Sequence, residues 1–297
     1  MKVLLLLFLF LISSVHTPAA DPPPGSPLFR FGALADCQYC KATSRVRKYS
    51  LSPNKLATCV EHYNQLELSF VVHLGDFIDR DFESFDTVVP IFNRLRAPHY
   101  HVLGNHDFSV LDEKKAHVPG KLGLKNRYYD FGRNGWRFIV VDGNDVSLYA
   151  WAKDDPRTKL AAQYHKTLKP APPKYNGAVG VEQLKWIESK LQVATKAQER
   201  VILFCHFPAF PKNGHNLWND KTLIDLLARY PCVAAYLNGH NHAGNYGQRD
   251  GIHYLTLKGM VDTEQSSYSI IEVFKDRLVV KGYGRETDRT LSLEDRL

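Results

Sequence analysis

The sequence predicts an α/β fold in a single domain over residues 29–297. Short apolar runs with the composition of buried strands alternate along the chain with segments whose apolar residues recur at helical spacing. Several of these runs stop at a polar residue, as strands do at the ligand-binding edge of an open α/β sheet. With 297 residues, 44% of them hydrophobic and 23% charged, the chain is long enough to bury a large core.

The N-terminal segment is expected to direct export. Lys2 precedes an unbroken apolar run at residues 3–12, and small and polar residues follow up to Ala20. This run is too short to span a bilayer as a mature helix, so residues 1–20 are predicted to be a cleaved signal peptide. Residues 21–28 are rich in proline and are predicted to form an extended tether. The expected location is secreted or periplasmic, with no stable membrane anchor after cleavage.

In the first half of the chain, apolar runs predict buried strands at residues 28–35, 70–74 and 99–103. Between them, segments with helical spacing predict helices at residues 52–66 and 85–95. The first of these helices opens at Ser52-Pro53, and proline is favoured at the first helical position. Strands and helices therefore alternate, which is the basis of the α/β prediction.

The second half begins with a predicted β-hairpin, because residues 128–131 and 136–141 flank an Asn134-Gly135 pair that favours a tight turn. A polar, proline-containing stretch at residues 145–175 is predicted to be a long surface insertion, a kind of segment that is often functional. The remaining strands are expected at residues 201–205, 233–237, 252–258, 269–274 and 278–283, and the remaining helices at residues 181–193 and 223–227.

Five apolar runs stop at residues that can ligate a metal ion. These residues are Asp36 with Gln38, Asp76, Asn105, His206, and His240 with His242. Each has an ordinary alternative explanation, because Asp and Asn cap helices, Gly-Asp and Gly-Asn form turns, and a single His is often only hydrogen-bonded. The coincidence of all five is much harder to explain in that way. His240 and His242 alternate in an extended segment, so their side chains can point to the same side.

The residue types predict the chemistry of this site. Carboxylates, carboxamides and imidazoles without thiolates suit Mn, Fe or Zn, and Asp76 can bridge two ions. Two metals about 3.5–4 Å apart can hold a hydroxide nucleophile and a phosphate oxygen for in-line displacement. Asn105, His106 and Asp107 form the expected catalytic segment, in which His106 donates a proton and Asp107 orients it. Arg80 either neutralises phosphate charge or pairs with a neighbouring Asp.

These residues stand in motifs that resemble the metallophosphoesterase (calcineurin-like) superfamily over about residues 29–245. The motifs are Asp36-x-Gln38, Gly75-Asp76-x-x-Asp79-Arg80, Gly104-Asn105-His106-Asp107, His206 and Gly239-His240-Asn241-His242. The resemblance implies a four-layer sandwich, in which two mixed β-sheets are flanked by helices, with a dinuclear metal site at one edge and His106 as the catalytic histidine. The ligands that it implies are Asp36, Gln38, Asp76 and His242 for one metal, and Asp76, Asn105, His206 and His240 for the other.

Asp36-Cys37-Gln38-Tyr39 departs from the Asp-x-His of most members and resembles the manganese-dependent ADP-ribose/CDP-alcohol diphosphatases. This resemblance implies two divalent metals, Mn preferred and Fe, Zn or Mg as alternatives, and cleavage of the diphosphate bond in nucleoside diphosphate derivatives. The expected substrate contacts are Arg80, Trp218 and Asn219. These relatives often carry a longer, aromatic-containing loop after the motif, whereas residues 40–47 are short and basic here.

Alternatives remain open. A broad-specificity phosphodiesterase or phosphomonoesterase would use the same site, whereas a non-catalytic scaffold is disfavoured because every ligand and the catalytic histidine are retained. The net charge of +7 is the only feature that favours nucleic-acid binding, and the charged residues are scattered along the chain. A small-molecule nucleotide or phosphoester is therefore the expected partner. The odd number of cysteines, five, predicts buried thiols or at most one disulfide.

Overall fold

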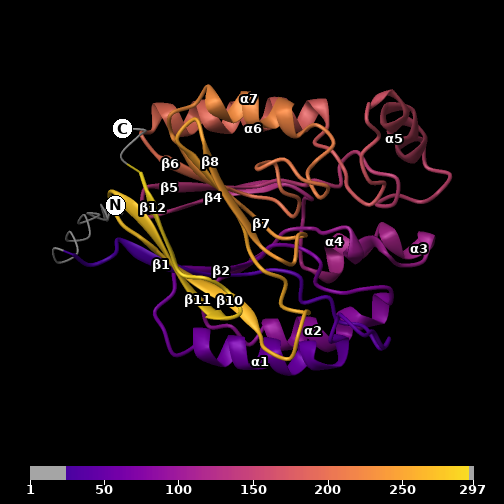
Figure 1. Cartoon of the computed structure of the whole chain (residues 1–297), viewed down its shortest axis with the longest axis horizontal. Coiled ribbons are helices and arrows are strands. Elements are labelled where there is room, and N and C mark those ends of the chain that lie inside the picture. Colours follow the sequence, from indigo (N-terminus) through magenta and orange to yellow (C-terminus); the bar gives the residue numbers. More distant parts are fainter. Residues whose placement is uncertain (1–24, 294–297) are drawn as a thin grey trace, which may run out of the picture.

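The computed structural model describes residues 25–293, so the predicted signal peptide at residues 1–20 and residues 21–24 of the predicted tether lie outside the described residues. Two six-stranded sheets pack face to face, and each carries helices on its outer side (Figure 1). This arrangement confirms the predicted four-layer sandwich of two mixed sheets flanked by helices.

The first sheet has the strand order β12-β11-β10-β1-β2-β3. Strands β1 to β3 are parallel, while β10 to β12 are antiparallel neighbours on the other side of β1. The bounds are β1 Phe29–Leu34, β2 Phe70–His73, β3 His99–His101, β10 Ser267–Val273, β11 Arg277–Gly284 and β12 Arg289–Ser292.

The second sheet has the order β4-β5-β6-β7-β9-β8, with four parallel strands between antiparallel edges. The predicted hairpin is confirmed as the antiparallel pair β4 and β5. The bounds are β4 Tyr129–Arg133, β5 Trp136–Val140, β6 Arg200–Phe204, β7 Val233–Asn238, β8 Asn245–Arg249 and β9 Ile252–Thr256.

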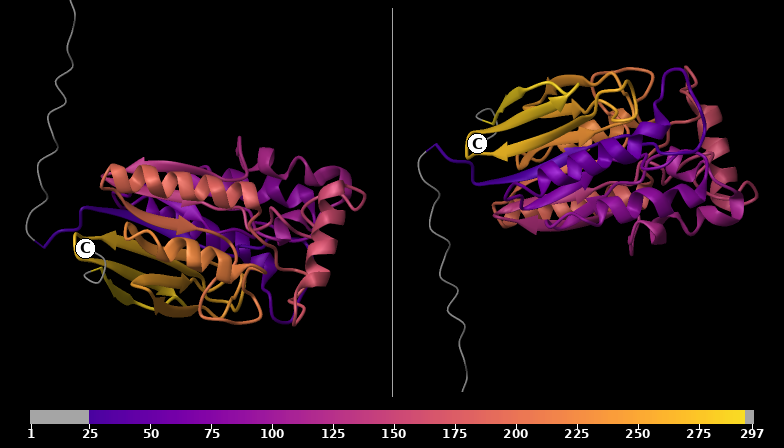
Figure 2. Two further views of the ribbon diagram at one scale, coloured as in Figure 1. Left: turned by 90° about the horizontal axis from the view of Figure 1, so that it is seen from above. Right: turned by 90° about the horizontal axis from the view of Figure 1, so that it is seen from below.

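Helices α1 and α2 cover the first sheet, and α6 and α7 cover the second (Figure 1). Helix α5 belongs to the predicted insertion and lies across one end of the layers (Figure 2). Within the residues described, no helix combines the length and the apolar character needed to cross a bilayer. The helix bounds are α1 Ser52–Tyr63, α2 Phe85–Phe92, α3 Asp112–Lys115, α4 Val118–Lys121, α5 Pro156–Thr167, α6 Val181–Lys196 and α7 Asp220–Ala228; the 3-10 turns are η1 Tyr49–Leu51, η2 Phe82–Ser84 and η3 His106–Phe108.

An aromatic cluster fills the space between the sheets. Phe31 of β1 stacks on Phe70 of β2 at 4.7 Å, and both rings lie edge-on to Phe138 of β5 in the facing sheet. All three rings are fully buried, and each contributes roughly 1.5–3 kcal/mol through removal of apolar surface from water. Since residues of both sheets share this cluster, it packs β1 and β2 of the first sheet against β5 of the second.

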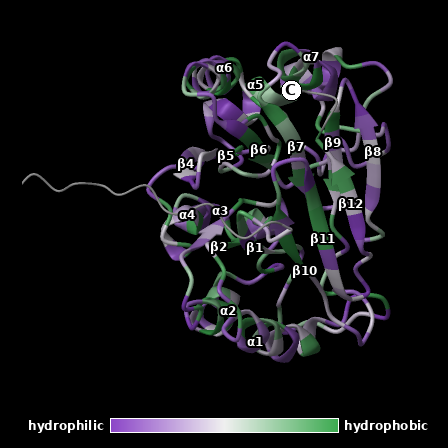
Figure 3. Ribbon diagram, turned by 90° about the vertical axis from the view of Figure 1, so that its left-hand side faces the viewer, coloured by the Kyte–Doolittle hydropathy of each residue, from purple (hydrophilic) through white to green (hydrophobic). Residues whose placement is uncertain are grey.

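The strand and helix predictions failed where the chain is polar. The edge strands β8 and β12 were missed because an edge strand needs no apolar run; β8 is mostly hydrophilic while β7 is mostly apolar (Figure 3). Helix α5 was also missed, although Asp155-Pro156 is a start signal, and the Asp155 side chain accepts the Arg157 amide hydrogen at 2.8 Å.

Four of the five cysteines agree with the expectation of buried thiols. Cys37, Cys40, Cys59 and Cys205 are buried, and none of these four forms a disulfide within residues 25–293.

Candidate metal centre

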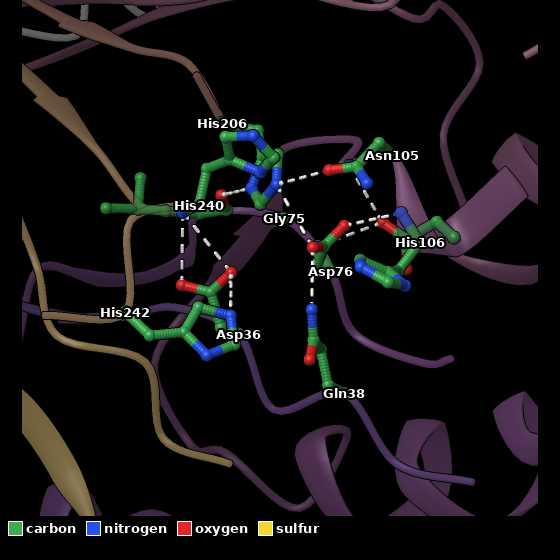
Figure 4. A network of polar contacts seen from close by, with 12 residues as sticks. Asp36, Gln38, Gly75, Asp76, Asn105, His106, His206, His240 and His242 are labelled. Carbon is green, nitrogen blue, oxygen red and sulfur yellow. Dashed lines mark hydrogen bonds and ion pairs between the residues drawn. The ribbon is translucent and has the colours of Figure 1, made fainter. Parts of the chain in front are cut away.

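The seven predicted ligands converge in one buried site at the carboxyl ends of β1, β2, β3, β6 and β7 (Figure 4). Six of them are at most 8% exposed, and the His242 side chain is 13% exposed. They are Asp36, Gln38, Asp76, Asn105, His206, His240 and His242.

Asp76 lies at the middle of the site. Its Oδ2 accepts a hydrogen bond from Gln38 Nε2 at 2.9 Å and lies 3.2 Å from His206 Nε2. Donor atoms of Asp76, His206 and His240 all lie within 4.8 Å of one another. His206 Nε2 is also 3.1 Å from Asn105 Oδ1.

The ligands form two halves that share Asp76. The His206 half consists of His206, His240 and Asn105. The Asp36 half consists of Asp36, Gln38 and His242, and in it His242 Nε2 lies 3.5 Å from Asp36 Oδ1. This division agrees with the two ligand sets that the sequence resemblance implies.

Each imidazole is oriented through the ring nitrogen that faces away from the centre. His206 Nδ1 lies 2.9 Å from the Leu74 carbonyl oxygen, and His240 Nε2 lies 2.9 Å from Asn176 Oδ1. His242 Nδ1 lies 3.0 Å from Asp262 Oδ1. Because these oxygens only accept, each outer nitrogen donates, and the inner ring nitrogen is the one that can bind a metal ion once it has no proton.

Two observations show that these residues fit divalent metal ions. Among the described residues, Gln38 Oε1 has no hydrogen-bond partner although it is buried, and an unsatisfied buried carbonyl costs about 1–3 kcal/mol. Burial lowers the pKa of the imidazoles, but Asp76 outweighs this and raises the pKa of His206 to about 9, while Asp36 raises that of His242 to about 10. The site therefore favours positive charge and offers a free oxygen ligand.

The backbone of the ligand loops is strained. Asp36, Gln38, Asp76 and His240 have φ values of 55°, 45°, 57° and 66°, in the left-handed region that L residues rarely adopt. Such conformations cost of order 1–3 kcal/mol each and persist where the surrounding structure enforces them, often at functional sites. Gly104 shows how tight the packing is, because a Cβ there would lie 2.1 Å from Asp76 Oδ1.

His106 is oriented by Asp79 rather than by Asp107, so the predicted role of Asp107 is wrong. His106 Nδ1 lies 2.8 Å from Asp79 Oδ1, and Tyr49 donates its hydroxyl hydrogen to Asp79 Oδ2 at 2.6 Å. Asp107 instead accepts backbone N–H groups, including that of Gly104 at 2.8 Å. Its buried carboxylate ties the loops after β2 and β3 together. Asp79 stands in the Gly75-Asp76-x-x-Asp79-Arg80 motif, so the sequence did contain a signal for it.

Arg47, and not Arg80, reaches the centre. Arg47 Nη1 lies 3.3 Å from His106 Nε2 and 3.3 Å from Asp79 Oδ2. A guanidinium group only donates, so His106 Nε2 accepts and the imidazole proton lies on Nδ1, toward Asp79. The Arg80 side chain is 61% exposed and only approaches Asp79, at 4.0 Å, which is the ion-pair alternative considered for it. Local sequence around Arg47 contains no signal that separates it from a surface cation.

Trp218 and Asn219, predicted as substrate contacts, do not line the pocket at the centre. Trp218 Nε1 donates to the Pro173 carbonyl at 3.0 Å. The Asn219 side chain donates to the Val179 carbonyl at 2.8 Å and accepts the Val179 amide hydrogen at 3.1 Å. Both residues stand just before α7 and connect it to the chain at, or shortly after, the end of the insertion.

A pocket of about 680 Å³ opens onto the ligands. Arg47, His106 and Ser109 contribute to its lining, and the insertion adds Tyr149 and Tyr175. The insertion also ends next to Asn176, whose amide donates to the Gly214 and Asn216 carbonyls while its oxygen meets His240. The insertion therefore shapes the pocket and supports the His206 half.

Comparisons with known proteins agree with this site. A family model described as calcineurin-like phosphoesterase matches residues 29–244. The chain is 31% identical to a manganese-dependent ADP-ribose/CDP-alcohol diphosphatase of Arabidopsis thaliana, over 90% of this chain and 97% of that protein. It is 27% identical to the mouse protein of the same name, over 93% and 96%. A dimetal phosphatase from Danio rerio has a similar fold, with a TM-score of 0.80 and 24% identity over 90% of this chain and 100% of that one. The chain belongs to the calcineurin-like phosphoesterase family.

Proposed function

We propose that this protein is a metal-dependent phosphohydrolase that cleaves the diphosphate bond of nucleoside diphosphate derivatives and uses two divalent metal ions, with Mn preferred. The observation that carries the proposal is the arrangement around Asp76. Two sets of oxygen and imidazole ligands share this carboxylate, and members of both sets line one pocket together with His106 and Arg47. The relatives named for manganese-dependent ADP-ribose and CDP-alcohol cleavage support the substrate class and the metal.

The two halves would each hold one divalent cation through their ligands. Bound there, two such cations would supply Lewis-acid chemistry, lowering the pKa of water and neutralising charge on a phosphoryl group. Asp76 contributes to both halves and so holds their ligands at a fixed spacing. Gln38 contributes a neutral oxygen where most members of the family carry His, which makes the Asp36 half a harder set of ligands.

His106 would donate a proton to the leaving group, and Asp79 would orient His106 for this transfer. Asp79 holds the imidazole by Nδ1, so that Nε2 points toward the pocket and stays within reach of a substrate oxygen. The carboxylate also stabilises the imidazolium form from which a proton is donated. Arg47 donates to Nε2 in this structure, and an incoming phosphoryl group offers its guanidinium a charged acceptor instead.

The pocket has the size expected for a nucleotide-like ligand, since small-molecule sites commonly measure about 300–1,000 Å³. Tyr149 and Tyr175 offer aromatic surface beside the ligands. One observation favours a second candidate, a broad-specificity phosphodiesterase or phosphomonoesterase. The loop at residues 40–47 contains no aromatic residue and contributes only Arg47 to the pocket lining, which suits recognition of phosphate more than of a base.

An activity panel tests this function and separates the two candidates. The protein is stripped of metal, supplied with Mn, Mg, Zn or Fe, and assayed on ADP-ribose, CDP-choline, cyclic nucleotides and an aryl phosphodiester. Highest kcat/KM on the two diphosphate substrates with Mn supports the proposal, and similar values across the panel support the broad-specificity enzyme. Absence of hydrolysis with every substrate and metal would rule out an enzyme of this class.

We also propose that residues 1–20 direct export and that the mature protein is secreted or periplasmic, without a stable membrane anchor. A separate part of the proposal is that the protein has no nucleic-acid partner. The support for export is the apolar run at residues 3–12 after Lys2 and the small residues up to Ala20. Intact-mass analysis of protein expressed from the full chain tests this. A mass that corresponds to loss of residues 1–19 or 1–20, found outside the cytoplasm, is expected, and uncleaved cytoplasmic protein contradicts it.

A further inference from the structure

A buried lysine lies behind the Asp36 half. Lys55 is on α1, is only 7% exposed, and donates from Nζ to the main-chain carbonyls of Thr263 at 2.6 Å and Met260 at 2.8 Å. A third carbonyl, that of Asp262, lies 3.4 Å away. A buried ammonium group is costly unless it is hydrogen-bonded, and these carbonyls offset that cost. All three acceptors belong to one short segment, residues 260–263, which we call the support loop.

The support loop has an unfavourable conformation that needs outside contacts. Thr263 has a φ of 58°, and a β-branched residue in the left-handed region is a genuine outlier. Strain of this kind is retained only where neighbouring groups enforce it. The Lys55 hydrogen bond to the Thr263 carbonyl acts at this residue. On its other side the loop is tied to the end of β1, where Val261 N donates to the Asp36 carbonyl at 2.9 Å.

The support loop carries the partner of a predicted metal ligand. Asp262 Oδ1 lies 3.0 Å from His242 Nδ1, so the loop decides where this carboxylate meets the imidazole. Through Val261 the loop also contacts the main chain of Asp36. The loop therefore touches two of the three ligands of the Asp36 half, whereas the supports of the His206 half, the Leu74 carbonyl and Asn176, lie elsewhere in the chain.

We propose that Lys55 is a positioning residue for the metal centre: its ammonium group holds the support loop so that Asp262 orients His242, and it thereby controls metal retention in the Asp36 half. Lys55 acts through other residues and touches neither substrate nor reacting atoms. The inference rests on the metal centre of the proposed function and is independent of its substrate.

The test is Mn²⁺ binding to the metal-stripped full chain, by calorimetry and by electron paramagnetic resonance at pH 7. Burial lowers the pKa of Lys55 to about 8, so the ammonium form still predominates at this pH. Wild type is expected to bind two ions. Lys55→Met is expected to keep one at wild-type affinity and to bind the second more weakly, by up to the roughly 10–100-fold that follows loss of a direct partner of a metal ligand.

A matched control and a double variant distinguish an effect of Lys55 on metal binding from an effect on the stability of the fold. Lys115 is also shielded, with a side chain 12% exposed, and donates to the Trp151 carbonyl, so Lys115→Met should leave both ions bound. Asp262→Asn should weaken the same ion as Lys55→Met. The double variant should be no weaker than the more affected single variant, because both changes act along one route.

Folded Lys55→Met that binds both ions at wild-type affinity overturns the inference, even if its melting temperature in EDTA is lower. Additive losses in the double variant overturn it as well, because Lys55 would then act by another route. If Lys55→Met yields no folded protein, Lys55→Gln, which keeps an N–H donor, takes its place with the same deciding outcomes. Wild type that binds no Mn²⁺ would overturn the metal centre itself, and with it both proposals.

Discussion

The two halves of the metal centre are built from similar ligands but are supported differently. The His206 half is buried, and its imidazoles donate to neutral oxygens of the Leu74 main chain and the Asn176 side chain. In the Asp36 half, His242 is partly exposed and donates to the carboxylate of Asp262. A carboxylate partner makes an imidazole a more basic ligand, but the benefit depends on where the support loop places it.

The two halves also differ in where their outer partners stand in the fold. The Leu74 carbonyl directly follows β2, so the sheet places the partner of His206, while the partner of His240 is Asn176, just after the insertion. Asp262 lies in a loop between β9 and β10, which is held by Lys55 and by the end of β1. Changes that displace the support loop should therefore affect the Asp36 half before the His206 half.

The largest loss of activity is expected from replacing Asp76, the carboxylate that both halves share. Asp76→Asn takes away the charge that both metals need, and activity should fall by about 10³-fold or more, since metal-assisted charge stabilisation supplies several kcal/mol. Calorimetry should show weaker binding of both Mn²⁺ ions. Asp86→Asn is the control, because that side chain is 65% exposed and lies on α2. Loss of only one ion would show that Asp76 belongs to a single half.

A second change should leave both halves intact and still stop turnover. His106→Ala removes the group held by Asp79, and kcat should fall about 10²–10⁴-fold, the usual contribution of a general acid. Metal analysis should still find two Mn²⁺ ions per chain. His117→Ala, at an exposed position, should have wild-type kcat. Wild-type turnover in His106→Ala would contradict the proton transfer proposed for this residue.

Removing one imidazole at a time should separate the halves. His240→Ala and His242→Ala should each lose one Mn²⁺ preferentially, and each should lower activity by roughly 10²-fold or more, because a lost ligand affects the metal at least as much as a lost outer partner. In His240→Ala, the affinity for the remaining Mn²⁺ should fall further when Asp262→Asn is added and should not change when Asn176→Ala is added. In His242→Ala, the affinity for the remaining Mn²⁺ should instead fall when Asn176→Ala is added and should not change when Asp262→Asn is added. Equal responses in both backgrounds would mean that the halves are not separate.

The smallest effect concerns pH in the metal-free protein. The pKa values of His206 and His242 are raised to about 9 and about 10, above the ordinary value near 6.5. Such groups stabilise the fold below pH 6.5 and lose this contribution as pH rises through their folded-state values. In EDTA the Tm should fall by roughly 5 °C or more between pH 6.5 and 9, at about 2–4 °C per kcal/mol. Saturating Mn²⁺ should abolish the fall, since metal replaces the protons; a Tm that rises with pH in EDTA would contradict the assignment.

The residues predicted as ligands could be recognised because each follows the end of a strand segment closely. Asp76, Asn105 and His206 follow β2, β3 and β6 within a few residues, so local sequence already placed them at strand ends. Their supports were not predictable in this way. Asn176 lies 64 residues from His240, and Arg47 lies 59 residues from His106, with no local pattern that links either pair.

Contacts between residues far apart in sequence also explain why the roles predicted for Asp107 and Arg80 differ from the structure. Asp107 adjoins His106 in sequence, yet Asp79 orients it, because the turn after β3 directs the Asp107 side chain to backbone amides of the loop after β2. Arg80 adjoins Asp79 but points outward, while Arg47 points inward from a loop that pairs with the support loop.

The α/β layers, the family motifs and the residues that face the centre follow from the amino-acid sequence, because burial periodicity and strand-end chemistry are local properties of the chain. Which groups stand behind each ligand depends on the tertiary structure, since packing two sheets face to face brings together segments that are far apart in sequence. The asymmetry between the halves is of this second kind. It arises where Lys55, Asp262 and His242 meet, and three separate stretches of chain must fold before that contact exists.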